Sequence, residues 1–136
     1  MIVAGIGCRR GASAAEIEGA VRAALARAEI DARALDAIAT IAAKRNEAGI
    51  EAAAKTLGVS LVVVSEHDCR AAGERTRTRS ERSLALTGLP SVAESAALAA
   101  AGPAAELIGA RLVAGAATCA LAASPAAAGT RTGARS

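Results

Sequence analysis

The sequence predicts an α/β fold in a single domain, with a mixed, mostly parallel sheet, helices on both faces and a C-terminal antiparallel hairpin. Three observations lead to this prediction. Strand and helix patterns alternate along a chain of 136 residues, which is the length of one domain. The helical segments repeat apolar residues every three or four positions, whereas the strand segments are short aliphatic runs. The last two strand patterns are separated by only a short Gly/Ala turn, which favours antiparallel pairing.

Three strand–helix pairs occupy the first half of the chain. The predicted strands are residues 2–7, 37–42 and 60–64, and the predicted helices are residues 13–28, 46–57 and 65–73. Ser13 and Glu16 form a capping-box pattern, which supports the start of the first helix. Because strand–helix–strand units give parallel strands, the three strands should end at one edge of the sheet, where such folds bind ligands. Residues 7–13, 42–46 and 65–68 are therefore expected at that edge.

The segment after the third helix is less regular. Residues 74–83 have no apolar face, so they are predicted to form an exposed basic loop whose arginines are simply solvated. Residues 84–86 are compatible with a short strand. A helix is predicted over residues 91–101, where Ser91 and Glu94 fit a capping box so well that capping alone explains both.

Two closing strands and a tail are predicted at the C-terminal end. The strands are residues 106–113 and 117–123. Residues 124–136 are low in sequence complexity, which predicts a disordered tail. The folded domain is therefore expected to span residues 1–123.

The composition excludes several classes of partner. The chain has no Phe, Tyr or Trp, so it lacks the side chains on which single-stranded nucleic acids stack. Its formal net charge of +3 suits an acidic small molecule but is too small to indicate a nucleic-acid partner. The apolar stretches are short or interrupted by glycine, and arginines follow the first of them rather than precede it. We therefore expect no nucleic acid, no membrane span and no signal peptide.

The cysteine and histidine content indicates neither a metal site nor a catalytic relay. Cys8, Cys69 and Cys119 are odd in number, far apart and without C-x-x-C spacing, which predicts reduced thiols in the cytoplasm. The single histidine, His67, lies on one helical turn with Ser65 and Cys69, which is poor geometry for a relay. No residue is therefore assigned a catalytic role, and no metal or cofactor is expected.

The stretch GIGCRRGAS connects the first strand to the first helix and allows three interpretations. A dinucleotide-binding loop fits poorly, because the spacing of Gly5, Gly7 and Gly11 is off by one residue and no acidic residue ends the second strand. A purely structural turn would use the glycines for their backbone angles. An anion site would combine the amides at the start of a helix with the guanidinium groups of Arg9 and Arg10.

Two further groups of residues have both a structural and a functional interpretation. Thr40 and Lys44 fall where the second strand gives way to a helix, and Glu47 lies in the first turn of that helix. Structurally, Glu47 complements the helix dipole and Lys44 is a solvated charge. Functionally, Lys44 would be another cation on the same rim as the two arginines. Ser91 and Glu94 have the capping interpretation given above.

Three segments, in this order and spacing, resemble the CobE/CbiG C-terminal domain family of cobalamin biosynthesis, and in particular its free-standing form. They are GIGCRRGAS, ATIAAKRNEAGI and GLPSVAESAALAAAG, and the resemblance covers about residues 2–122. It implies a small α/β fold with a mixed sheet. The matching positions are Gly5, Gly7, Cys8, Arg9, Arg10, Gly11, Thr40, Lys44, Glu47, Gly49, Gly88, Ser91, Val92, Glu94, Ala96 and Ala97.

The resemblance also implies a ligand, because corrin intermediates carry acetate and propionate side chains. The candidate binding residues are Gly7, Cys8, Arg9, Arg10, Gly11, Ser13, Thr40, Lys44, Glu47, Ser91 and Glu94. Two features depart from the family pattern. Arg111 is the nearest cation to a position where family members usually have lysine, and the basic loop before Leu84 replaces a more apolar segment.

The resemblance leaves three possible functions. In the first, the protein binds a carboxylate-rich precorrin or corrinoid intermediate, as a carrier or as a partner of other cobalamin-pathway enzymes. In the second, it hydrolyses the ring lactone of a precorrin-5A-like intermediate, with Glu94 or Glu47 as the base and Arg9 or Lys44 as the donor. In the third, it is a structural subunit. The first is favoured, because no residue cluster combines a nucleophile, a base and an orienting group.

Overall fold

The structure is a computed structural model that describes residues 1–9, 11–42, 47–81, 84–85, 89 and 91–125. Six strands of this part form one sheet in the order β3-β2-β1-β6-β4, and β5 pairs with the other end of β6. The strands are β1 (Ile2–Cys8), β2 (Ala37–Ile41), β3 (Ser60–Val64), β4 (Glu106–Leu107), β5 (Leu112–Ala114) and β6 (Ala117–Ala123). The predicted mixed sheet is therefore confirmed.

The strands β1, β2 and β3 run parallel, and β6 runs antiparallel to β1. Gly5 pairs with Ala39 of β2, which pairs with Val62 of β3, and on the other side Gly5 pairs with Ala120 of β6. As predicted, the carboxyl ends of the three parallel strands meet, and we call this edge the carboxyl end of the sheet. The turn between β5 and β6 lies at the same end, because Ala117 pairs with Cys8.

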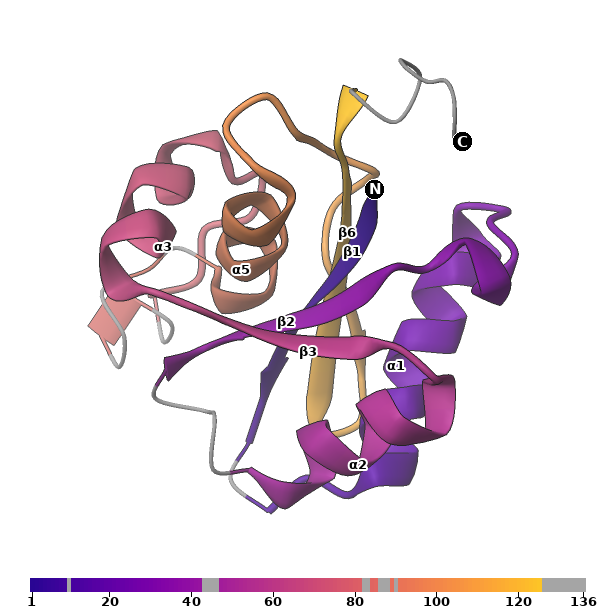
Figure 1. Ribbon diagram of the computed structural model, residues 1–136. Helices are drawn as coiled ribbons and strands as arrows, with labels where there is room; N and C mark the ends of the chain where they lie inside the picture. The colour runs from indigo at the N-terminus through magenta and orange to yellow at the C-terminus, as the bar shows by residue number, and fades with distance from the viewer. Residues whose placement is uncertain (10, 43–46, 82–83, 86–88, 90, 126–136) are drawn as a thin grey trace.

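Helices cover both faces of the sheet, as the sequence predicts. They are α1 (Ala14–Arg27), α2 (Ala48–Leu57), α3 (Glu66–Ala72) and α5 (Val92–Ala101). Helices α1 and α2 lie on one face, and α3 and α5 lie on the other (Figure 1). Ile17, Val21 and Leu25 of α1 are buried against the first face, whereas Ala93 and Ala97 of α5 are buried against the second. Small alanine side chains allow α5 to pack closely on the sheet, since the chain has no aromatic residue to fill a wider gap.

Local capping patterns begin the helices where the sequence predicts. The Ser13 hydroxyl accepts from the Glu16 amide and the Glu16 carboxylate accepts from the Ser13 amide, which completes the capping box of α1. The Ser65 hydroxyl caps α3 by accepting from the Asp68 amide. Helix α2 begins two residues later than predicted, at Ala48.

Two predicted strands are wrong in detail. Leu84 and Ala85 are helical, and the Leu84 amide donates to the Ser80 carbonyl rather than to a neighbouring strand. The predicted strand 106–113 is broken into β4 and β5 by a bend at Gly109, whose φ of +77° departs from strand geometry. Leu86 and most of the predicted tail, residues 126–136, lie outside the described residues.

The basic loop 74–83 is not simply solvated, which corrects the prediction. The Arg75 guanidinium donates to the carbonyl of Ala105 (2.8 Å), and the Arg77 guanidinium donates to the carbonyl of Leu107 (3.3 Å). These bonds attach the loop to the segment that follows α5. The pattern of alternating polar residues could not show them, because the acceptors lie 30 residues away.

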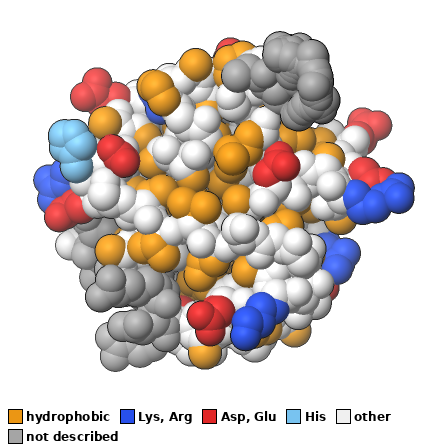
Figure 2. Space-filling model, viewed as in Figure 1, with side chains coloured by type: hydrophobic (Ala, Val, Ile, Leu, Met, Phe, Trp, Pro, Cys, Tyr) orange, Lys and Arg blue, Asp and Glu red, His pale blue; other side chains and the backbone are white. Residues whose placement is uncertain are grey.

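One face of the molecule exposes part of the sheet edge. β3 is the terminal strand of the sheet, and its burial is less complete than that of β1. Figure 2 shows hydrophobic side chains across the middle of this face, and Val63 is 42% exposed. Within the described ranges, no helix is long and apolar enough to span a membrane.

Candidate functional site

Several helices begin at the carboxyl end of the sheet. Helices α1, α2 and α3 are the helices that follow β1, β2 and β3 in the chain, each after a short connection, so each begins near the end of its strand. Helix α5 begins there too, because a Cβ on Gly7 would lie 3.5 Å from the Val92 Cβ and 3.6 Å from the Ala93 amide nitrogen. The partial positive charges of these N-termini therefore face the same region, which favours an anionic ligand.

The loop after β1 is held in a fixed shape at this end. The Arg9 amide donates to the Ala116 carbonyl (2.9 Å), and the Ala12 amide donates back to the Arg9 carbonyl (3.1 Å). Gly11 has a φ of +80°, a conformation that side chains disfavour, so the glycine is required by the turn. The Arg9 side chain remains exposed. The structural interpretation of the glycines and the anion-site interpretation are thus compatible.

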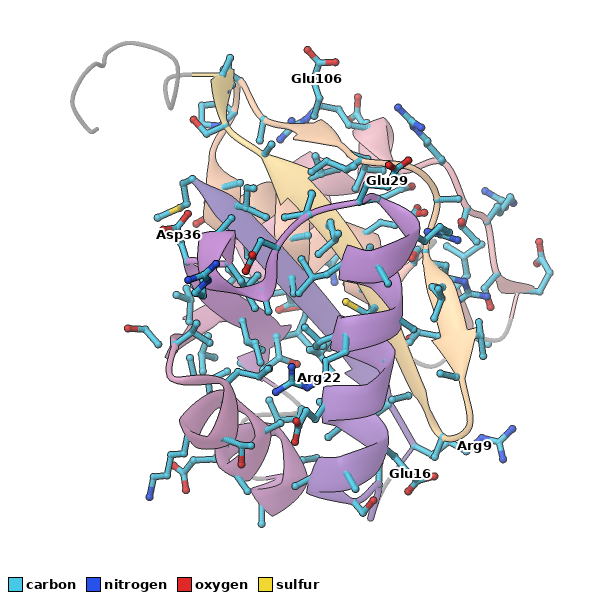
Figure 3. The ribbon with its side chains drawn as sticks, turned by 90° about the vertical axis from the view of Figure 1, so that its right-hand side faces the viewer. Arg9, Glu16, Arg22, Glu29, Asp36 and Glu106 are labelled. Carbon is cyan, nitrogen blue, oxygen red and sulfur yellow. The ribbon has the colours of Figure 1, made fainter. Side chains whose placement is uncertain are left out.

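Arg9 lies at the opposite end of the molecule from several acidic residues. Figure 3 shows Arg9 and Glu16 at one end, with Glu29, Asp36 and Glu106 at the other. An exposed guanidinium at the carboxyl end of the sheet can form paired hydrogen bonds with a carboxylate or phosphate. This arrangement keeps a cation where an anionic ligand would approach the helix N-termini.

Glu16 joins the start of α1 to the β5–β6 turn, a contact that the sequence analysis missed. Its Oε1 accepts from the Ser13 amide (3.0 Å), and its Oε2 accepts from the Ala116 amide (3.4 Å). These two amides, with the Ser13 hydroxyl, hold the pKa of the Glu16 carboxyl below its ordinary value. The capping-box pattern identified the first bond, but the second is 100 positions away in sequence.

Glu47 has a different role from the one that its helix position suggests. It is the N-cap residue of α2 but makes no capping bond, and its Oε1 instead accepts from the Gly11 amide at 3.0 Å. The carboxylate therefore connects the start of α2 to the loop after β1. The backbones of the two segments also touch, since a Cβ on Gly49 would lie 2.3 Å from the Ala12 carbonyl oxygen.

Thr40 does not reach the predicted site surface. It is fully buried within β2, and its hydroxyl donates to the Ile6 carbonyl of β1 at 3.2 Å. Thr118 on β6 makes a comparable bond, from its hydroxyl to the Gly7 carbonyl at 2.9 Å. Thr118 was missed by the sequence analysis, although its place in the antiparallel hairpin puts it beside the end of β1. Both threonines reinforce the strand ends from which the site is built.

Glu94 is buried, and capping alone does not explain it. The Ser91 hydroxyl accepts from the Glu94 amide (3.3 Å), as predicted, but the Glu94 carboxylate turns away from α5. Both of its oxygens accept hydrogen bonds, from the amides of Arg77, Thr78 and Arg111 and from the Thr78 hydroxyl. Ser91 and Glu94 are both fully buried, so they fix the start of α5 through contacts in the interior of the protein.

The structure therefore brings together part of the predicted site. Gly7, Cys8, Arg9, Gly11 and Ser13 lie at the carboxyl end of the sheet, and Glu47 and Ser91 lie at helix starts beside it. Arg10 and Lys44 lie outside the described residues. Across the described ranges, no three His, Cys, Asp or Glu side chains form a group suited to a metal ion.

Cys69 and Cys119 are buried thiols, and burial raises their pKa from 9.0 to about 11 and about 12, respectively. We expect neither to react with a thiol reagent at pH 8 until urea unfolds the chain. Because the unfolded thiols lose their protons first, the free energy of unfolding should fall as pH rises from about 9 toward 12. Urea titrations over this range test the effect, and a Cys119→Ala variant that keeps the full decline would contradict its assignment to Cys119.

Comparisons with known proteins identify the family. The model of the family described as cobalamin synthesis G C-terminus matches residues 2–122. The curated protein CobE from Sinorhizobium sp is 36% identical over 121 residues, which are 89% of this chain and 79% of that protein.

Solved structures agree with this match. The crystal structure of CobE, a protein from the cobalamin (vitamin B12) biosynthetic pathway, superposes with a TM-score of 0.84 at 36% identity, covering 90% of this chain and 89% of that one. The cobalamin biosynthesis protein chiG from Agrobacterium tumefaciens gives a TM-score of 0.74 at 45% identity, covering 92% and 99%. The chain therefore belongs to the cobalamin synthesis G C-terminus family and is a protein of cobalamin biosynthesis.

Proposed function

We propose that this protein binds a carboxylate-rich precorrin or corrinoid intermediate at the carboxyl end of the sheet. It would do so in the cytoplasm, as a carrier or as a partner of other cobalamin-pathway enzymes. The observation that carries the proposal is the convergence of helix N-termini beside the exposed Arg9. Acetate and propionate groups on a corrin ring are the anions that such a region attracts.

Charged contacts at Arg9 and the helix N-termini would supply part of the binding free energy. A well-made charged hydrogen bond contributes about 1.5–3 kcal/mol. Two or three of them contribute about 3–9 kcal/mol before the loss of translational and rotational freedom is subtracted, so micromolar affinity, roughly 8 kcal/mol net, also requires burial of the apolar surface of the macrocycle. With no aromatic residue in the chain, the face of the macrocycle would rest on aliphatic side chains.

The hydrolase alternative has less support from the geometry. Glu94 is fully buried and its carboxylate oxygens already accept hydrogen bonds, so it is not placed to activate water. Glu47 is partly exposed, but its Oε1 is bonded to the Gly11 amide. Binding without turnover is the function that these positions support better.

The Arg9→Ala/Arg10→Ala variant should bind hydrogenobyrinic acid at least about tenfold more weakly than the parent, because each guanidinium can pair with a ring carboxylate. Titration followed by corrinoid absorbance measures this change. Arg22→Ala/Arg33→Ala is the matched control, since it removes the same charge from exposed side chains of α1 and the 32–34 turn.

The same titration separates the possible functions. Saturable binding that is weaker for the amidated corrinoid supports recognition of carboxylates. A progressive spectral change at substoichiometric protein would instead show turnover and favour the hydrolase. If the parent binds neither form, or if both double variants bind like the parent, the proposed site is wrong.

A further inference from the structure

Glu47 holds a backbone amide in the loop to which the proposed function assigns the ligand. The bond from the Gly11 amide to Glu47 Oε1 joins two segments 36 positions apart. Because the Glu47 side chain makes this bond, it does not cap the N-terminus of its own helix, α2. Gly11, with its positive φ, presents this amide at the carboxyl end of the sheet. A carboxylate from the chain thus occupies a donor that an anionic ligand could use.

We infer that Glu47 is an internal carboxylate that takes the place of a ligand carboxylate at Gly11 and is replaced when the ligand binds. This inference rests on the proposed function. An acetate or propionate group bonded to the same amide would form the same charge-assisted hydrogen bond. Glu47 is then a specificity-determining residue, because only a ligand that brings its own carboxylate can restore the bond that it breaks.

Glu16 shows why the replaceable carboxylate is Glu47. Both oxygens of Glu16 are bonded, and one of those bonds belongs to the local capping box of α1. Displacing Glu16 would uncap a helix and separate it from the β5–β6 turn. Glu47 has one bonded oxygen among the described contacts, is partly exposed and caps nothing, so it can swing aside at much smaller cost.

The surrounding packing would survive the exchange. Gly49 brings α2 against the backbone at Ala12, and Ile50 is buried in the core shared with Ile17. These contacts hold α2 and the start of α1 together independently of the Glu47 side chain. Release of Glu47 therefore frees the Gly11 amide without moving the helices.

The test measures hydrogenobyrinic acid and its amidated form binding to the parent, Glu47→Gln, Glu47→Ala and Glu51→Gln. Both Glu47 variants should bind the acid about threefold to tenfold more tightly than the parent, because a like charge is removed from the ligand's position. Their preference for the acid over the amidated form should also increase. Glu51→Gln is the matched control: it removes the same charge from the first turn of α2, and the described contacts of Glu51 include none with the loop. It should bind like the parent.

The outcomes separate this inference from the proposed function. Tighter binding by both Glu47 variants, with no change in Glu51→Gln, supports the exchange. Unchanged or weaker binding by the Glu47 variants, with saturable binding by the parent, overturns the exchange and makes Glu47 a fixed support for the loop. An equal gain in Glu51→Gln also overturns it, since the effect is then one of net charge. Absence of binding by the parent and by every variant overturns the proposed function, and this inference with it.

Discussion

Replacing Glu94 with alanine is expected to lower the free energy of unfolding by about 3–5 kcal/mol. The carboxylate is fully buried and accepts from the amides of Arg77 (2.9 Å), Thr78 (2.8 Å) and Arg111 (2.9 Å), and from the Thr78 hydroxyl (2.8 Å). Alanine would leave these donors without their acceptor and would open a cavity where the buried side chain lay. Urea unfolding followed by circular dichroism measures the loss.

Glu94→Gln distinguishes the stability lost with the hydrogen bonds from the stability lost through the cavity. It keeps the volume of the side chain but replaces one acceptor oxygen with an amino group, which would face donors such as the Arg111 amide. A loss of about 2 kcal/mol or more is expected from this change alone. Glu66→Ala is the control: among the described residues the Glu66 carboxylate pairs only with Arg70, in an exposed ion pair, so its removal should cost about 0.5 kcal/mol. If Glu94→Ala lowers the free energy of unfolding no more than Glu66→Ala does, the buried carboxylate does not hold the loop at residues 74–83.

The features predicted correctly from sequence are those whose evidence is local. β1 and β3 are short aliphatic runs, and the capping box at Ser13 and Glu16 lies within four residues. The convergence of strand ends followed from the same information, because strand–helix–strand units have a fixed handedness and direction. Thus the meeting of strand ends and helix starts at the carboxyl end of the sheet, where we propose that the ligand binds, was predictable.

The features that sequence could not predict depend on contacts between distant segments. The pattern of Ser91 and Glu94 predicts a local capping box, yet the Glu94 side chain turns to donors 16 and 17 residues away. The Glu47 side chain likewise reaches Gly11 instead of its own helix. Single-residue patterns also fail for residues 84 and 85 of the short predicted strand, because a strand requires a neighbour that periodicity does not reveal. The hydrogen-bond partners of Glu47 and Glu94 are therefore set by tertiary contacts, which a local sequence pattern does not reveal.

Gly5→Ala is expected to lower the free energy of unfolding by about 3 kcal/mol, because α5 leaves no room for a side chain on β1. A Cβ at this position would lie 2.0 Å from the Ala93 carbonyl oxygen, 2.6 Å from the Ala97 amide nitrogen and 2.9 Å from the Ala97 Cβ. Two of these three atoms belong to the helix backbone, so rotation of a side chain cannot relieve the overlap. The whole helix must move away from the sheet. Gly5→Val should lower the free energy of unfolding further, because valine is larger than alanine.

Gly19→Ala provides the matched control for the effect of adding a methyl group. Gly19 is exposed in the middle of α1, and a Cβ there would meet no atom within 4 Å. Alanine should therefore stabilise the chain by about 0.5–1 kcal/mol through its higher helix propensity. The opposite signs of the two substitutions, measured in the same urea titration, distinguish close packing from a general intolerance of glycine replacement. If Gly5→Ala unfolds at the parent's midpoint, α5 is not seated on β1 as closely as described, and the start of α5 is not fixed beside Gly7.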